Sequence, residues 1–190
     1  MTYTPRKSLP HIYTFWRKKY YFGWPLAEEI SIEDIANSLS NICRFTGHCS
    51  KFYSVAEHSV RVSYLCSPEN QLRALLHDSA EAFLGDISRP LKHSVGMETY
   101  RIYERQGLDA IMEHFELPFE EPAEVKDADN RLLITEQRDL LWGEPFMDIE
   151  PLPEKIVPWT PEEAKRIFLM RFYELTNTRT FYRLSTRGAA

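Results

Sequence analysis

Four polar side chains stand where the sequence predicts apolar helix faces. His58 follows the helix start SVAEHS, His77 and Asp78 adjoin in ALLHDSAEAFLGDIS, and Asp129 lies in the apolar segment EVKDADNRLLI. Burying imidazoles and carboxylates beside a core is costly unless they are paired, hydrogen-bonded or bound to metal. Two imidazoles and two carboxylates suit one borderline divalent transition ion, whereas calcium prefers more oxygen ligands. These residues predict a metal site with positions left open for water and substrate.

Capping residues and helical periodicity predict the elements that carry these side chains. Ser54 and Glu57 form a capping box, so His58 is expected in the first turn of a helix. Further helices are predicted from Ser31, over about residues 97–115, from Pro122 to Gly143, and from Thr160 to about Leu175.

The HD dipeptide lies in the most apolar of these segments. Apolar residues recur at helical spacing over 72–83, which predicts one helix from residue 67 to a glycine stop at 85. On a continuous helix His77, Asp78 and Glu81 would point to one side, because they are three and four residues apart.

Composition predicts a single, mainly α domain. The chain has 190 residues, of which 43% are hydrophobic and 13% aromatic, which is enough for one substantial core. The domain is expected to cover residues 1–175, with a small β-hairpin element at 1–28, a metal-binding helical core at 29–142, a proline-rich loop at 143–159, a C-terminal helix at 160–175, and a loosely held tail at 176–190.

Charge and hydropathy argue against several classes of protein. The formal net charge is -5, so no overall positive field gathers a nucleic-acid polymer. No apolar stretch reaches the ~20 residues that span a membrane. Three cysteines without a CxxC pair favour a reducing cytoplasm. Cys43, His48 and Cys49 lie close together, but a closed structural zinc site requires a fourth ligand.

Several separated motifs resemble a known family. EHS at 57–59, HDSAEAFLGDISRPLK at 77–92 and VKDAD at 125–129 resemble the H…HD…D signature of the HD-domain phosphohydrolases. The stretch NICRFTGHCSKFYSVAEHS at 41–59 is similar to the small 5′-deoxynucleotidase branch of bacteria, prophages and phages, which includes phage deoxyadenosine triphosphate (dATP) triphosphohydrolases. The resemblance covers about residues 30–142 and implies an HD-domain helical bundle.

The resemblance also implies roles for individual residues. By this resemblance, the metal ligands are His58, His77, Asp78 and Asp129. Asp127 is the rival of Asp129 as the last ligand. The resemblance makes Glu81 and Asp86 the acidic pair that handles the attacking water and the leaving group, and Arg44 and Lys92 the residues that hold phosphate. The expected cofactor is a divalent transition metal such as zinc, cobalt or manganese, and a second divalent ion could accompany a nucleotide.

Other candidates have a structural explanation of equal or greater weight. His48, four residues after Arg44, could face the sugar or base of a substrate or be a hydrogen-bonded structural histidine. His93 and His114 could serve a second metal, although their spacing fits the family poorly. Aromatic residues that could stack on a base, but for which core packing is favoured, are Trp16, Phe22, Trp24 and Phe45.

The predicted function is metal-dependent cleavage of the 5′ phosphoester of 2′-deoxynucleotides, which releases either a single phosphate or intact triphosphate. The metal-activated water would attack the phosphorus nearest the sugar. Hydrolysis of a signalling nucleotide, either cyclic or a guanosine polyphosphate, is one alternative, and a non-catalytic nucleotide or protein binder is another. The resemblance further implies a homo-oligomer, a dimer or a hexamer, in the cytoplasm of a bacterium or a phage-infected bacterium.

Overall fold

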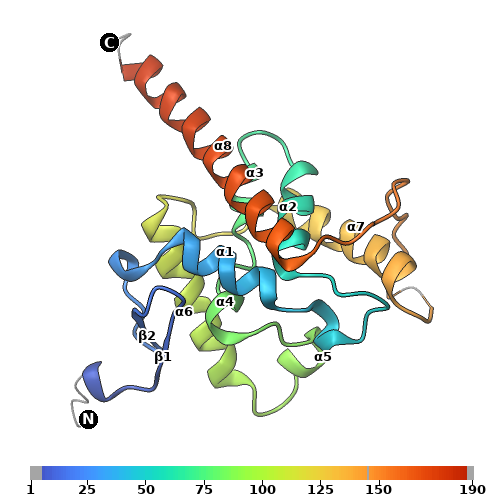
Figure 1. Ribbon diagram of the computed structural model, residues 1–190, viewed down its shortest axis with the longest axis horizontal. Helices are drawn as coiled ribbons and strands as arrows, with labels where there is room; N and C mark the ends of the chain where they lie inside the picture. Colours follow the sequence, from blue (N-terminus) through green and yellow to red (C-terminus); the bar gives the residue numbers. More distant parts are fainter. Residues whose placement is uncertain (1–5, 145, 188–190) are drawn as a thin grey trace.

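The computed structural model describes residues 6–144 and 146–187, with side chains as far as residue 177 (Figure 1). Its α-helices and strands are β1 (His11–Tyr13), β2 (Lys19–Tyr21), α1 (Ile32–Asn41), α2 (Val55–Tyr64), α3 (Gln71–Leu75), α4 (Glu81–Leu84), α5 (Arg89–Lys92), α6 (Glu98–His114), α7 (Ala123–Leu140) and α8 (Pro161–Arg187). Short 3-10 turns are η1 (Arg6–Ser8), η2 (Ala27–Glu29) and η3 (Arg44–Gly47). The predicted mainly α class with a small N-terminal hairpin is confirmed.

The hairpin is an antiparallel pair that packs against the helices. His11 pairs with Tyr21 and Tyr13 pairs with Lys19. The Tyr20 ring stacks on Phe83 of α4, with ring centroids 4.0 Å apart. Its hydroxyl lies 2.5 Å from where a Cβ would stand on Gly107, so only glycine allows α6 to approach the hairpin this closely.

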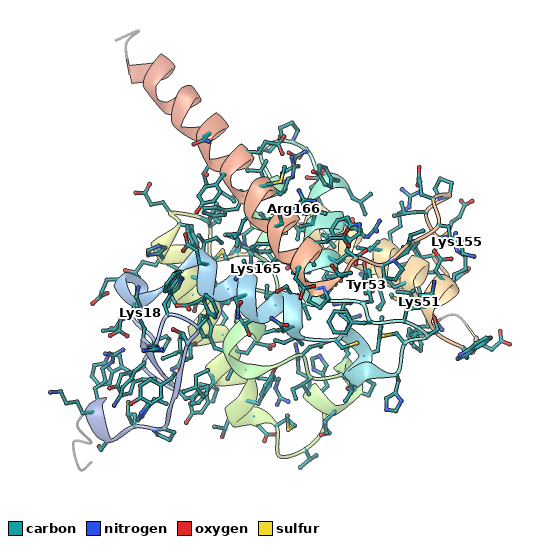
Figure 2. The ribbon with its side chains drawn as sticks, in the orientation of Figure 1. Lys18, Lys51, Tyr53, Lys155, Lys165 and Arg166 are labelled. Carbon is teal, nitrogen blue, oxygen red and sulfur yellow. The ribbon has the colours of Figure 1, made fainter. Side chains whose placement is uncertain are left out.

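Two hydrophobic cores meet at α2 and α3. The first core combines α1, α2, α3, α4, α6 and α8, and the second combines α2, α3 and α7 with Tyr53 and Ile156. Tyr53 of the second core is fully buried. Figure 2 shows Lys18 on the hairpin side of the molecule and Lys155 on the opposite side. Because α2 and α3 belong to both cores, apolar packing holds them on two sides.

The predicted continuous helix from residue 67 to 85 is wrong. Helix α3 ends at Leu75, α4 begins at Glu81, and the turn between them is joined by bonds from Ser79 N to Leu76 O (3.2 Å) and Glu81 N to Asp78 O (3.0 Å). These are i to i−3 bonds, and Ser79 Oγ also donates to Leu76 O at 2.6 Å. Polar side chains that bond to nearby carbonyls compete with the helical ladder, which explains the break. The glycine stop at 85 is confirmed, with a φ of 82°.

The C-terminal helix is longer than predicted. Helix α8 continues to Arg187, through most of the predicted tail at 176–190, and residues 188–190 lie outside the described residues. No proline or glycine interrupts residues 162–187, so nothing in the sequence ends the helix earlier. Figure 1 shows its C-terminal half extending away from the body of the molecule.

The connection before α8 carries no helix or strand at 141–144 or 146–160. Arg138 at the end of α7 holds it by donating to Leu152 O (2.6 Å) and Glu154 O (2.9 Å). Helix α7 itself ends three residues before the predicted stop at Gly143. Among the described residues, no helix combines the length and the apolar character that crossing a membrane requires.

Candidate functional site

Side chains from three segments converge on one point beside α2. His58 lies in the first turn of α2, Asp129 lies on α7, and His77 and Asp78 lie in the turn between α3 and α4. Capping positions His58, because Ser54 Oγ accepts a hydrogen bond from Glu57 N at the start of α2. His58 Nε2 is 3.4 Å from His77 Nε2 and 3.3 Å from Asp129 Oδ1. Asp78 Oδ2 is 3.1 Å from His77 Nε2 and 3.6 Å from His58 Nε2.

These separations are close to the edges of a coordination polyhedron. Ligand atoms about 2.1 Å from a zinc-like ion lie ~3.0 Å apart at octahedral angles and ~3.4 Å apart at tetrahedral angles. His58, His77 and Asp129 are buried, and their ligand atoms lie within 4.8 Å of one another. This cluster could hold a metal ion, and the Asp78 carboxylate stands beside it.

Hydrogen bonds orient both imidazoles toward this point. His58 Nδ1 donates to Glu136 Oε1 at 2.6 Å, and His77 Nδ1 donates to Ala74 O at 2.7 Å. With each Nδ1 bonded to an acceptor, the two Nε2 atoms face each other across the cluster. Metal-binding histidines almost always donate their other ring nitrogen to a carboxylate or a carbonyl in this way.

Glu136 links the cluster to Arg44. Its Oε2 accepts from Arg44 Nε at 3.2 Å and from Nη2 at 3.0 Å, and Arg44 Nη1 lies 3.7 Å from Asp78 Oδ2. Burial raises the pKa of Glu136, but the charges of Arg44 and His58 outweigh it and hold the pKa below its usual range. Glu136 is therefore an ionised carboxylate that orients both His58 and the guanidinium.

Three members of the cluster, His58, Asp78 and Asp129, favour their charged forms despite their burial. Burial and Arg44 lower the pKa of His58, but Glu136 and Asp129 outweigh them and raise it to about 9. Burial raises the pKa of Asp78, yet His77 and His58 keep it well below its usual range. The same balance, with the hydrogen bond to His58 as the strongest favourable contact, lowers the pKa of Asp129. Both carboxylates are thus ionised at neutral pH.

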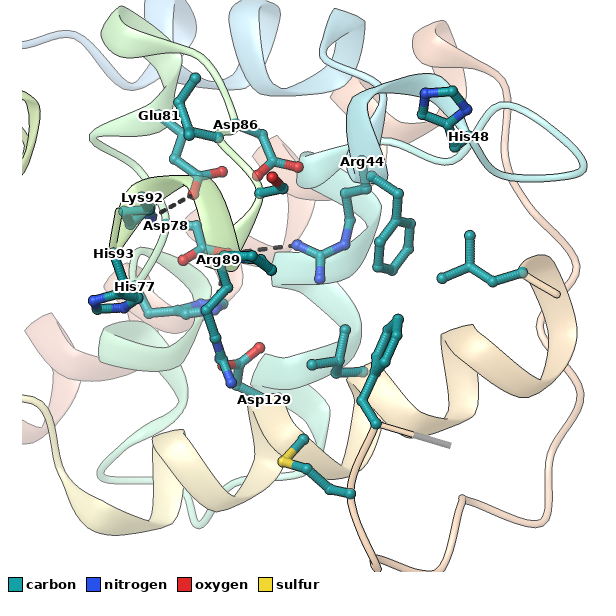
Figure 3. A pocket seen from close by; sticks show the side chains of 18 of the residues that line it. Arg44, His48, His77, Asp78, Glu81, Asp86, Arg89, Lys92, His93 and Asp129 are labelled. Atoms are coloured by element: carbon teal, nitrogen blue, oxygen red, sulfur yellow. Dashed lines mark ion pairs between the residues drawn. The ribbon is translucent and has the colours of Figure 1, made fainter. Parts of the chain in front are cut away.

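Glu81 and Asp86 behave differently. Burial and the neighbouring carboxylates Asp78 and Asp86 raise the pKa of Glu81 well above its usual range. Burial also raises the pKa of Asp86, although Arg44 opposes the shift. Lys92 Nζ lies 3.6 Å from Glu81 Oε1 (Figure 3). It also donates to Glu104 Oε1 at 2.6 Å. An acid with this raised pKa retains a proton that it can donate.

A cavity of about 920 Å³ opens over the cluster. It is lined by eight of the predicted site residues, namely Arg44, His48, His77, Asp78, Glu81, Asp86, Lys92 and Asp129. In Figure 3 His48 lies on one side of Arg44, and the other labelled members of this set lie on the opposite side or below it. The volume falls in the range of ligand-binding pockets.

Comparison with known proteins identifies relatives. No family model matches the chain. It is 40% identical over 176 residues to the uncharacterized protein YfdR of Escherichia coli strain K12, an alignment that covers 88% of this chain and 97% of that protein. The chain belongs to the same family as YfdR. It is also 37% identical over 113 residues to the uncharacterized protein RCAP_rcc00048 of Rhodobacter capsulatus, which covers 55% of this chain and 57% of that relative.

Within this member of the YfdR family, other predicted candidates lie apart from the ligands. Asp127, the rival of Asp129, is exposed and does not line the cavity. His48 is exposed and lies beyond Arg44 from the ligands (Figure 3). His93 lines the cavity, whereas His114 packs edge-on against Phe115 at the end of α6. Of the four aromatic candidates, Phe45 alone lines the cavity. Cys43 and Cys49 do not belong to the group of His58, His77 and Asp129, and their Sγ atoms lie 3.5 Å apart.

The structure adds functional residues that the sequence did not indicate. Glu136 orients His58, and Glu104 fixes Lys92. Two basic side chains approach Asp129 Oδ2, Lys126 Nζ at 2.7 Å and Arg89 Nη2 at 3.5 Å. One signal was readable: Glu136 is seven residues after Asp129 on α7, which places both carboxylates on one helix face.

Proposed function

We propose that this protein is an HD-domain metal-dependent phosphohydrolase that cleaves the 5′ phosphoester of 2′-deoxynucleotides. The observation that carries the proposal is the group of His58, His77, Asp78 and Asp129 beneath a cavity. Hydrogen bonds at the two Nδ1 atoms turn both Nε2 atoms into this group. Two nitrogen and two carboxylate ligands fit zinc, cobalt or manganese. The substrate is either a deoxynucleoside triphosphate such as dATP or a deoxynucleoside monophosphate, because the same ester bond is cut in both.

The bound ion would supply Lewis acidity and an activated water, and a second divalent ion could accompany a triphosphate. The residues around it supply the rest of the chemistry. Arg44, fixed by Glu136, offers a guanidinium fork to phosphate oxygens, and Lys92 offers a point charge. Arg89 and Lys126 add positive charge on the Asp129 side of the cavity.

Glu81 and Asp86 divide the proton transfers in this proposal. Glu81, with the more strongly raised pKa, donates a proton to the departing 5′ oxygen, and Asp86 accepts the proton of the attacking water. Two carboxyl groups whose surroundings hold protons to different degrees are suited to opposite roles.

The decisive experiment is a chromatographic assay of all deoxynucleoside mono- and triphosphates with zinc, cobalt and manganese in turn. We expect release of the deoxynucleoside, and loss of that release on chelation. Asp78→Ala and Asp129→Asn should abolish turnover while circular dichroism shows a folded chain. Asp127→Asn is the matched control, because Asp127 is exposed two residues away, and it should keep full activity.

Two outcomes would reject the proposal: full activity in Asp129→Asn, or no product with any metal. Turnover of cyclic nucleotides or guanosine polyphosphates alone would favour the signalling-nucleotide hydrolase instead. Nucleotide binding without turnover would favour a binder. The predicted dimer or hexamer is checked by light scattering on the same preparation.

A further inference from the structure

The cavity has an apolar wall in addition to its charged side. The wall consists of Phe45, Leu133, Leu141, Trp142, Phe146 and Met147. Asp129 and Leu140 are eleven residues apart on α7, which is about 16 Å along the helix axis. Leu141 and Trp142, which directly follow Leu140, therefore line the cavity well away from the metal ligands. This leaves room for a sugar between the ligands and the wall.

Hydrogen bonds hold this wall in place. Gln137 is 4% exposed, its side-chain amide donates to Glu144 O, and its Oε1 accepts from Phe146 N at 2.8 Å. Ser50 N donates to Leu140 O at 2.8 Å, which ties the end of α7 to the segment that follows η3. The buried amide therefore holds the backbone of Glu144 and of Phe146 at the cavity.

Trp142 is the outstanding side chain of the wall. It is 90% exposed although it lines a cavity, and Phe146 is 62% exposed. An exposed aromatic ring leaves apolar area in water, and an offset-stacked ring that covers it gains about 0.5–1.5 kcal/mol beyond the area buried. None of the six wall side chains carries a carboxylate or an amide that could read the hydrogen-bonding edge of a base.

We propose that Trp142, supported by the loop that Gln137 holds, is the stacking platform for the base of the substrate nucleotide. This inference rests on the proposed function and adds the part of the substrate that the metal ligands leave unspecified. Because the wall recognises a ring face and no edge, it should accept all bases and bind purines more tightly than pyrimidines, since purines cover more of the ring.

The test measures binding of deoxyadenosine, which has no phosphate, by saturation-transfer NMR titration in the presence of a chelator. Trp142→Ala should weaken binding about 5- to 150-fold. Trp142→Phe should lose less, because it keeps a smaller ring. The matched control is Trp24→Ala, since Trp24 is 46% exposed and does not line the cavity; it should bind deoxyadenosine as the unaltered protein does. Inorganic triphosphate, titrated separately, should bind Trp142→Ala and the unaltered protein equally.

The inference is overturned if Trp142→Ala binds deoxyadenosine as tightly as the unaltered protein does. It is also overturned if triphosphate binding falls in parallel, or if the substitution changes only the oligomer size in light scattering. The readout separates this inference from the proposed function, because nucleoside binding needs neither metal nor turnover. If binding of deoxyadenosine depends on Trp142 but the protein hydrolyses nothing, only the proposed function is rejected. If the protein hydrolyses deoxynucleotides and Trp142→Ala has an unchanged KM, only the stacking platform is rejected.

Discussion

Glu136 is the residue whose replacement best separates the organisation of the proposed metal site from the stability of the fold. Its carboxylate is fully buried and serves two donors, His58 through Oε1 and Arg44 through Oε2. In Glu136→Gln one oxygen becomes an NH2 group. Leaving the buried guanidinium without an acceptor is the more costly arrangement, so the remaining oxygen should stay with Arg44.

The NH2 group would then face His58 Nδ1, which must become an acceptor. Loss of the Glu136 charge and hydrogen bond lowers the pKa of His58, and the proton of the neutral imidazole then lies on Nε2, the atom that points into the ligand group. Metal binding must first reverse this tautomer. Loss of the partner behind a metal-binding histidine typically lowers affinity about 10- to 100-fold, or about 1.4–2.7 kcal/mol. We expect a loss of this size for Glu136→Gln.

The assay is titration with Co²⁺ followed by visible absorption, together with Zn²⁺ competition against a chromophoric chelator at neutral pH. The matched control is Glu57→Gln. Glu57 is equally buried, next to His58 in the chain, but its carboxylate accepts from Arg61 Nη2 at 2.7 Å and from Trp159 N at 2.7 Å. Both variants should lose stability in urea unfolding, and only Glu136→Gln should lose metal affinity. Unchanged affinity in Glu136→Gln, or an equal loss in Glu57→Gln, refutes the reasoning.

Two further predictions concern stability. In the presence of a chelator, the free energy of unfolding should fall by up to about 3 kcal/mol as pH rises from about 6.5 to 9. The folded pKa of His58, about 9, exceeds its unfolded value. Its contribution to the free energy of unfolding is therefore complete below the unfolded pKa and is lost as pH rises through the folded pKa. A flat pH profile in urea titrations would contradict the raised pKa. Gly107→Ala should cost about 1–3 kcal/mol despite its better helix propensity, because its methyl group meets the Tyr20 hydroxyl. The same change in a Tyr20→Phe background should cost less, and equal costs in a double-mutant cycle would show that this contact is not responsible.

The residues of the cluster could be singled out because each interrupts an apolar pattern. An imidazole or a carboxylate on a core-facing stripe requires a partner, and this reasoning holds whichever local structure carries the side chain. His77 and Asp78 show the point, since the structure places them beside His58 although the helix predicted to carry them is broken.

The break itself could not be read from hydrophobic periodicity. It depends on Ser79 Oγ and His77 Nδ1 finding carbonyls of their own segment, and a serine or a histidine in an apolar run does so only where packing turns the side chain inward. Glu136 was missed for a related reason. In TEQRD its carboxylate resembles those of exposed helix positions, and its spacing from Asp129 indicates the helix face but not the burial behind His58.

The location of the site between two cores explains how so many ionisable groups can be kept together. Helix α2 contributes Val55 and Val60 to the first core and Val62 to the second, and His58 stands between them. Helix α3 likewise contributes Leu75 to the first core and Ala74 to the second, two and three residues before the HD dipeptide begins. Apolar packing on both sides therefore holds the segments that carry these side chains, so the fold does not depend on any one of their mutual bonds. This is the physical reason to expect that removing one ligand carboxylate lowers the stability of the chain without unfolding it, while metal chemistry is abolished.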